Sequence, residues 1–116
     1  MQILSDRNGQ TVGYLYNNVL LLTDLTVAGV LLAHCVYSLS GKIEGKFFKG
    51  ILYNKVGEII AKQMTGDSPK ISPAESVGIA QSAWEILARS HPNDIPWVTP
   101  SEKWSEHSYR EFLLSK

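Results

Sequence analysis

Residues 10–21 have the sequence QTVGYLYNNVLL, in which two apolar runs are separated by the turn signal Asn17-Asn18. Apolar and β-branched runs on either side of such a signal predict a strand, a turn and a second strand. Related stretches return at sixteen-residue steps, so that residues 3–66 hold one β-hairpin unit written four times. Four copies of a two-stranded unit predict about eight strands.

Small side chains mark the repeat most clearly, and they form columns that are in phase with one another. One column lies within strands, and another closes the longer turns. Their members are Gly13, Gly29, Gly45 and Ala61, and then Gly9, Leu25, Gly41 and Gly57. Leucine in the second copy leaves the type of that turn open. The shorter turns contain Asn18, His34, Gly50 and Gly66, which are residues that tolerate positive φ.

The glycines within strands need a physical reason, because glycine there costs about 0.5–1 kcal/mol relative to alanine. If four hairpins are arranged radially, one residue per copy must face its equivalents or lie beneath a neighbour's aromatic ring, where only a small side chain fits. Closing the ring also protects strand edges that an open sheet would expose. We therefore predict a closed or radial β structure with pseudo-fourfold symmetry.

Residues 52–57 (LYNKVG) and 41–45 (GKIEG) show how each copy combines apolar residues, an aromatic residue, a turn and glycines. This pattern resembles the 4-fold β-flower domain of small bacterial proteins, and the resemblance covers the repeats. It implies the four-hairpin fold. It brings no activity, cofactor or site residue with it.

A helical tail is expected after the repeats, because residues 65–73 are rich in Gly, Asp, Ser and Pro and mark a boundary. Ser72-Pro73-Ala74-Glu75 combines a capping hydroxyl, a proline at the first helical position and a glutamate at the third. The helix is expected to end near His91-Pro92. The apolar stripe predicted for its buried side consists of Val77, Ala80, Trp84, Leu87 and Ala88.

A second, shorter helix is expected farther along the tail. Thr99-Pro100-Ser101-Glu102 repeats the capping pattern, so we expect a helix through Trp104 and on toward Leu114. The second repeat is apolar on both strand faces, so we expect the tail to dock there. The chain is thus predicted to be one α+β domain, 1–116, with the hairpin repeats at 3–66 and the helical tail at 67–116.

Charge and cysteine content limit the class of function. Eleven Lys plus Arg balance eleven Asp plus Glu, so no bulk field attracts nucleic acid or anionic lipid. The longest apolar stretch, Val27 to Tyr37, is too short to span a bilayer. With Cys35 alone no internal disulfide can form, as expected in a reducing compartment. We predict a cytoplasmic protein that binds neither nucleic acid nor membranes.

Catalytic and metal-binding chemistry has little support in the sequence. An imidazole next to a thiol, as in His34-Cys35, could activate a nucleophile, but Cys35 shares its column with Ile3, Val19 and Ile51. A strand slot otherwise filled by aliphatic residues indicates a structural cysteine. Neither a nucleophile elbow nor a phosphate-binding loop is found. The spacing of His91, Asp94, Glu106 and His107 matches no known metal site, so no metal or other cofactor is predicted.

Two functional hypotheses remain. The first is a noncatalytic interaction or scaffold module that self-associates, or binds another protein, through the second repeat or the tail. The second is a ligand-binding or hydrolytic protein whose site surrounds the turn where His34 breaks the fourfold pattern. The candidate binding residues are Asn17, Asn18, His34 and Trp97, with His107 as a further candidate from the tail.

Overall fold

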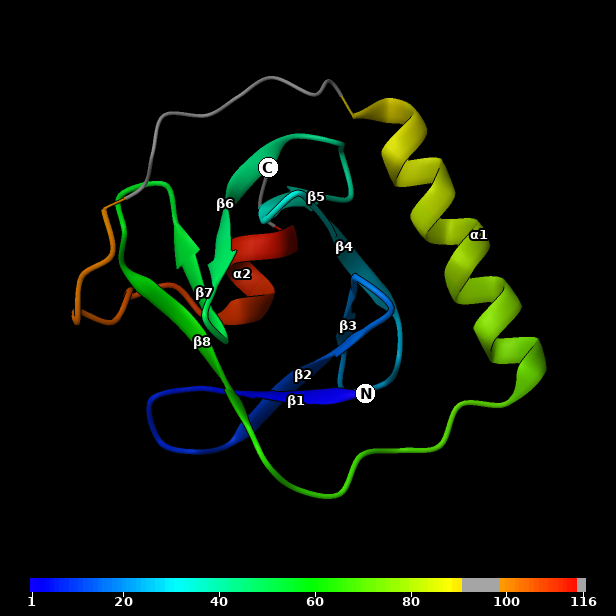
Figure 1. The fold of residues 1–116 in the computed structure, drawn as a ribbon, viewed down its shortest axis with the longest axis horizontal. Coiled ribbons are helices and arrows are strands. Elements are labelled where there is room, and N and C mark those ends of the chain that lie inside the picture. Colours follow the sequence, from blue (N-terminus) through cyan, green and yellow to red (C-terminus); the bar gives the residue numbers. More distant parts are fainter. Residues whose placement is uncertain (91–98, 115–116) are drawn as a thin grey trace.

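Eight antiparallel strands in chain order close into a β-barrel, in which β1 pairs with β8 (Figure 1). The structure, a computed structural model, describes residues 1–90 and 99–114. The strands are β1 (Gln2–Ser5), β2 (Thr11–Tyr16), β3 (Val19–Leu22), β4 (Val27–Leu32), β5 (Cys35–Ser38), β6 (Ile43–Phe48), β7 (Ile51–Asn54) and β8 (Ile59–Met64). Helices α1 (Pro73–Arg89) and α2 (Tyr109–Leu114) follow. The predicted closed β structure with a helical tail is confirmed.

The strand pairing repeats every sixteen residues. Gly13 pairs with Leu22, and the equivalent pairs Gly29 with Ser38 and Gly45 with Asn54 follow at that step. Bulges recur between residues 4/5, 20/21, 36/37 and 52/53. Short turns lie at one end of the barrel and longer turns at the other, because successive strands run in opposite directions.

Most of the turn residues adopt the left-handed backbone that their columns predict, but Gly66, which follows β8, does not have a positive φ. Asn18 and His34 have φ values of 64° and 69° in the short turns. In the longer turns Leu25 has φ 70°, close to the 77° of Gly9, and its N–H donates to the Leu22 carbonyl oxygen at 3.0 Å. The second copy therefore forms the same turn as the others, with a leucine in a glycine conformation.

Crowding explains the glycines within strands, although its source differs from the predicted one. A Cβ on Gly29 would lie 2.6 Å from the Tyr37 carbonyl oxygen of the neighbouring strand and 3.2 Å from Cδ2 of Leu113. At Gly13 the ring of Tyr109 occupies this space. The prediction that equivalent residues or a neighbouring copy's aromatic ring crowd these positions is therefore wrong. The backbone of the neighbouring strand crowds Gly13, Gly29 and Gly45, and α2 adds to the crowding at Gly13 and Gly29.

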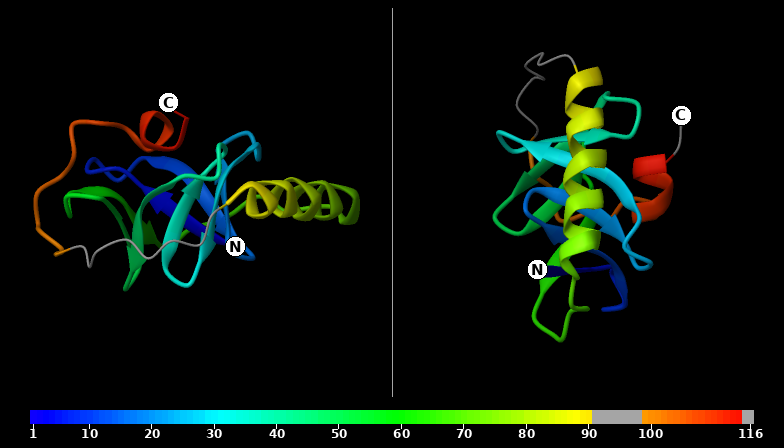
Figure 2. Two further views of the ribbon diagram at one scale, coloured as in Figure 1. Left: turned by 90° about the horizontal axis from the view of Figure 1, so that it is seen from above. Right: turned by 90° about the vertical axis from the view of Figure 1, so that its right-hand side faces the viewer.

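The barrel interior is apolar and is closed by α2 at the end with the longer turns. The inward column of Leu4, Leu20, Val36 and Leu52 is fully buried. These side chains form one cluster with Tyr109, Phe112 and Leu113 of α2. Figure 2 shows α2 against the barrel and α1 along another side of it. Burying an apolar helix face in this opening replaces water with well-packed hydrocarbon.

Helix α1 docks outside the second repeat, as predicted, but through a different face. Its buried residues are Ile79, Ala83 and Ile86, which pack with Val30 and other residues of β3, β4 and β5. The predicted stripe containing Val77 and Trp84 is wrong, since these two side chains are 67% and 73% exposed. The helix has two apolar faces, and the isoleucines lie on the buried one.

The predicted helix through Trp104 is also wrong. Residues 103–105 run extended beside β8, where the Ile59 N–H donates to the Lys103 carbonyl oxygen at 2.8 Å. Trp104 packs against Tyr53 and Ile59 on the outside of the barrel. Only α2 is helical in this part of the tail, and its capping box is Ser108 with Glu111. The hydrogen bonds between this segment and Ile59 of β8 keep it extended, and they outweigh the capping pattern at Thr99.

Candidate functional site

The solvent side of α1 carries a stripe of exposed side chains, apolar except for Gln81 at its centre, that nothing in residues 1–90 and 99–114 covers. Its members are Ala74, Val77, Gln81, Trp84 and Ala88. Their spacing alternates between three and four residues, which is the pattern of a helix–helix seam. Trp84 is the one exposed aromatic side chain in the described part of the chain. An exposed indole on such a seam is typical of a binding surface.

A groove of about 230 Å³ lies beside Trp84, between α1 and the first short turn. Tyr16 and Asn17 form one wall, and Ser76, Ala80 and Trp84 belong to the other. The hydroxyl oxygens of Tyr16 and Ser76 lie 3.1 Å apart and join the two walls. The sequence-predicted residue Asn17 therefore lies at this groove, with φ 48° in its turn.

Two other sequence-predicted residues, Asn18 and His34, line a depression of about 370 Å³ at the short-turn end of the barrel. Its apolar lining includes Leu15, Leu31 and Phe47 from one inward column. The carbonyl oxygen of His34 accepts a hydrogen bond from the Phe47 N–H at 2.9 Å, so the turn is fixed to the next hairpin. The imidazole is exposed and meets Phe48 edge-on, with ring centroids 6.5 Å apart.

The structure does not bring the tail candidates to this turn. His107 lines a different depression, of about 580 Å³, which lies beside α2 and the long turn between β7 and β8. That turn is at the opposite end of the barrel from His34. Trp97 lies outside the described residues. Of the candidate residues that the structure describes, only Asn18 and His34 line the same depression.

Cys35 occupies a structural position. It is half-buried and packs in the cluster formed by α1 and the outer side of the second repeat. Within residues 1–90 and 99–114, no group of three His, Cys, Asp or Glu side chains is arranged to hold a metal ion. His91 and Asp94, two of the four residues whose spacing in the sequence matches no known metal site, lie outside this part of the chain.

Comparison with known families gives a match for almost the whole chain. The model of the 4-fold beta flower protein family matches residues 2–113. The chain belongs to this family. The match includes the helical tail, so the β-flower unit extends beyond the hairpins that carry the resemblance in the sequence.

No curated protein and no solved structure matches this β-flower chain. The family description states no activity or ligand, so function has to be inferred from the surfaces themselves. Among the described residues, no helix is long and apolar enough to cross a membrane.

Proposed function

We propose that this β-flower protein is a noncatalytic interaction module that self-associates through the solvent side of α1. The observation that carries this proposal is Trp84, 73% exposed in the middle of a stripe with seam spacing. Leaving an indole in water forgoes about 1.5–3 kcal/mol of burial free energy, which a partner can recover. Interfaces commonly use tryptophan in this way.

A second copy of the chain is the occupant that this surface fits. Trp84 protrudes from α1, while the groove between Asn17 and Ala80 lies directly beside it. A surface that carries both a protrusion and a groove can pair with its own copy about a two-fold axis. Small side chains at Ala74 and Ala88 let two helices approach closely.

Charge along α1 favours an antiparallel pair. Glu75 lies in the first turn of the helix and Arg89 in the last. When two copies run in opposite directions, Glu75 of each copy approaches Arg89 of the other, and the helix dipoles also oppose each other. Between these ends, Glu85 is the one formally charged residue of the helix.

The expected dimer is weak. A helix of 17 residues is about 25 Å long, and pairing along one such helix buries less than the roughly 1,200–2,000 Å² of a stable standard interface. We expect a dissociation constant of about 10 μM to 1 mM, at the low-affinity end of specific association. Self-association should therefore appear only in concentrated samples.

Sedimentation velocity across this concentration range tests the proposal. The wild-type chain should shift from monomer to dimer, and Trp84→Ala should remain monomeric. Leu32→Ala is the matched control, because it truncates an exposed apolar side chain outside α1 and should dimerise normally. A wild-type chain that stays monomeric throughout, or a Trp84→Ala variant that still dimerises, would rule out this interface.

A second candidate function is ligand binding, or hydrolysis, at the short-turn end of the barrel. The observation that favours it is that Asn18 and His34 place polar groups around an apolar depression of about 370 Å³. A thermal-shift screen of metabolites and sugars should then find a compound that raises the unfolding temperature. His34→Ala should abolish that shift, whereas His107→Ala, which removes an exposed histidine at the other end, should retain it.

Three further features belong to the proposal. The sixteen-residue step in strand pairing supports a pseudo-fourfold relation among the hairpins. The lone cysteine supports action in the bacterial cytoplasm. The balance of charges supports partners that are proteins or small molecules, with neither nucleic acid nor a membrane bound.

A further inference from the structure

Two positions at the α2 end of the barrel differ in chemistry from their equivalents in the other repeats. Glu44 is the charged member of an inward column whose other members are apolar. Val56 is the apolar member of a turn column whose other members are polar, and it is 74% exposed. The two columns are Val12, Ala28, Glu44 and Ile60, and Asn8, Asp24, Ser40 and Val56. Both exceptions line the same depression, of about 580 Å³.

The depression exists because α2 covers this end of the barrel unevenly. Tyr109 and Leu113 approach the glycines of the first two hairpins, Gly13 and Gly29. At Gly45 the nearest atoms belong to the backbone of β7 instead. An eight-stranded barrel is just wide enough to be filled by side chains or to hold one small ligand. Because α2 covers the first two hairpins, this end of the barrel stays open beside the third and fourth hairpins.

The floor of this depression is apolar and part of the core. It includes Ile60, Phe112 and Leu114, of which Ile60 is 3% exposed and Phe112 is 8% exposed. A ligand that brings an apolar group to this floor gains free energy by removing both surfaces from water.

Glu44 is the carboxylate left available in this depression. It is half-buried and makes no hydrogen bond or ion pair with any described residue. Two neighbouring carboxylates already have partners. Oε2 of Glu58 lies 3.4 Å from Nζ of Lys103. Hydrogen bonds with Ser108 lower the pKa of the Glu111 carboxyl group. A half-buried carboxylate without a partner favours a ligand that carries a positive charge.

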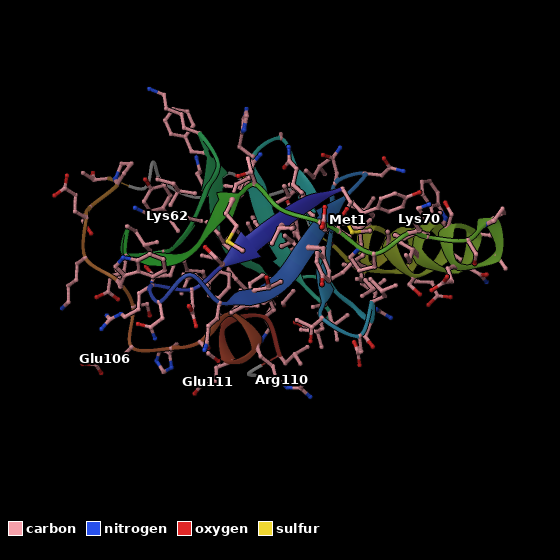
Figure 3. All side chains as sticks on the ribbon, turned by 90° about the horizontal axis from the view of Figure 1, so that it is seen from below. Met1, Lys62, Lys70, Glu106, Arg110 and Glu111 are labelled. Carbon is pink, nitrogen blue, oxygen red and sulfur yellow. The ribbon has the colours of Figure 1, made fainter. Side chains whose placement is uncertain are left out.

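Positive groups line the rim of the same depression. Lys55 comes from the long turn and Arg110 from α2, and the imidazole of His107 lines the same depression. Arg110 projects from the solvent side of α2 (Figure 3). No ion pair joins Lys55 or Arg110 to another described residue. These cations can receive a negatively charged group of a ligand at the edge of the site.

We propose that this depression binds a small zwitterion with an apolar side group, of the α-amino-acid class. Glu44 receives the ammonium group, the cations of the rim receive the carboxylate, and Ile60 and Phe112 receive the side group. The site lies away from the solvent side of α1, so it does not depend on self-association. Its volume lies within the roughly 300–1,000 Å³ that small-molecule sites occupy.

Titration of the ¹⁵N-labelled full chain with L-leucine tests the proposal by NMR. Amide signals around Glu44, Val56 and Arg110 should shift in a saturable way. Leucinamide, which lacks the carboxylate, and N-acetyl-L-leucine, which lacks the ammonium group, should each bind at least about tenfold more weakly. Glycine should also bind more weakly, because it brings nothing to the apolar floor.

Four variants separate this site from nonspecific binding. Glu44→Gln and Lys55→Gln should each raise the dissociation constant for L-leucine about tenfold. The controls are Glu85→Gln on α1 and Arg7→Gln, which is the equivalent of Lys55 in the first repeat, and both should bind as the wild type does. Spectra of the free variants establish that each one is folded.

Three results would overturn the assignment. The first is the absence of saturable shifts with L-leucine up to about 10 mM, a concentration that would detect even a weak site. The second is equal binding of leucinamide and L-leucine. The third is unchanged affinity in both Glu44→Gln and Lys55→Gln.

Discussion

Gly13 is a residue at which the barrel and the tail pack closely together. A Cβ there would lie 2.5 Å from Cε2 of Tyr109 and would also overlap the carbonyl oxygen of Leu21. The Tyr109 hydroxyl donates to this same carbonyl oxygen at 3.0 Å. Neither the backbone of β3 nor the buried ring can move away without breaking this bond.

Gly13→Ala should therefore lower the free energy of unfolding by about 1–3 kcal/mol, the usual cost of overpacking a core. Gly78→Ala is the matched control. Nothing lies within 4 Å of a Cβ at position 78, in the middle of α1, so this substitution should stabilise the helix by up to about 1 kcal/mol. Urea denaturation measures both changes. Equal effects of the two substitutions would contradict the crowding described at Gly13.

Tyr109 should make stability depend on pH in alkaline solution. Burial raises the pKa of its hydroxyl above the ordinary value of 10.0, so the folded chain keeps the proton while the unfolded chain releases it. The contribution of Tyr109 is complete below pH 10 and is lost as pH rises further, by about 1.4 kcal/mol per pH unit.

Comparison of the wild type with Tyr109→Phe isolates this contribution from the other titrating groups. At pH 7 the variant should be less stable by about 1–3 kcal/mol, because the Leu21 carbonyl loses its hydrogen-bond donor. Above pH 10 the difference should narrow. Denaturant unfolding at several pH values measures it, and a difference that stays constant would show that Tyr109 ionises normally in the folded chain.

Much of what the sequence predicts about single residues comes from comparing equivalent positions in the four repeats. Positive φ at Asn18 and His34 was predictable, since glycine occupies the same column in later copies. Glu44 and Val56 could have been found in the same way, by comparing each position with its three equivalents. The source of crowding at Gly13 was not predictable, because Tyr109 lies far away in the sequence.

At the scale of elements, α1 shows why a helix can be predicted more securely than its orientation. The capping residues Ser72 and Glu75 hydrogen-bond reciprocally, as the sequence predicted. Both Trp84 and Ile86 lie on apolar stripes of this helix, so periodicity alone does not identify the buried one. The outer surface of β3 and β4 is built from aliphatic side chains, and the branched isoleucines pack against it.

Two substitutions in α1 should separate its two faces. Ile86→Ala should lower the free energy of unfolding by about 2–5 kcal/mol, since Ile86 is 1% exposed and leaves a cavity when truncated. Trp84→Ala should change it by no more than about 0.5 kcal/mol in dilute samples, where the exposed indole contacts no partner. Thermal or urea unfolding of dilute protein measures both, and a large loss in Trp84→Ala would contradict the assignment of its face to solvent.

The extended segment before α2 shows that a capping pattern in the sequence does not by itself decide where a helix forms. Capping patterns begin at Thr99 and at Ser108, yet only the second one starts a helix. Hydrogen bonds from Ser101 to the Gly57 carbonyl oxygen and from Ser105 to the Ile59 carbonyl oxygen hold the intervening residues extended. These partners come from β8 and the turn before it, so the choice between the two patterns depends on the folded barrel.

At the scale of the whole molecule, closure of the barrel followed from the repeats, whereas the position of the tail did not. A sheet of eight strands in chain order leaves two edges unless β1 meets β8, and the pairing of Ile3 with Met64 closes them. The tail has no symmetry of its own. It covers the second repeat with α1 and one part of the long-turn end with α2, and this asymmetry leaves one opening beside Glu44.

The prediction that residues 1–116 form one domain can be tested with probes that the chain already contains. All three tryptophans lie in the tail, whereas the lone cysteine lies in β5 of the barrel. Because α2 supplies Tyr109, Phe112 and Leu113 to the barrel core, neither part should keep its structure when the other unfolds. Tryptophan fluorescence and the rate of Cys35 thiol labelling should therefore follow one urea transition with the same midpoint. If fluorescence and Cys35 labelling changed together at lower urea while the β-sheet signal in far-UV circular dichroism persisted, the tail would be a separate unit docked on a self-sufficient barrel, because Cys35 packs beside α1.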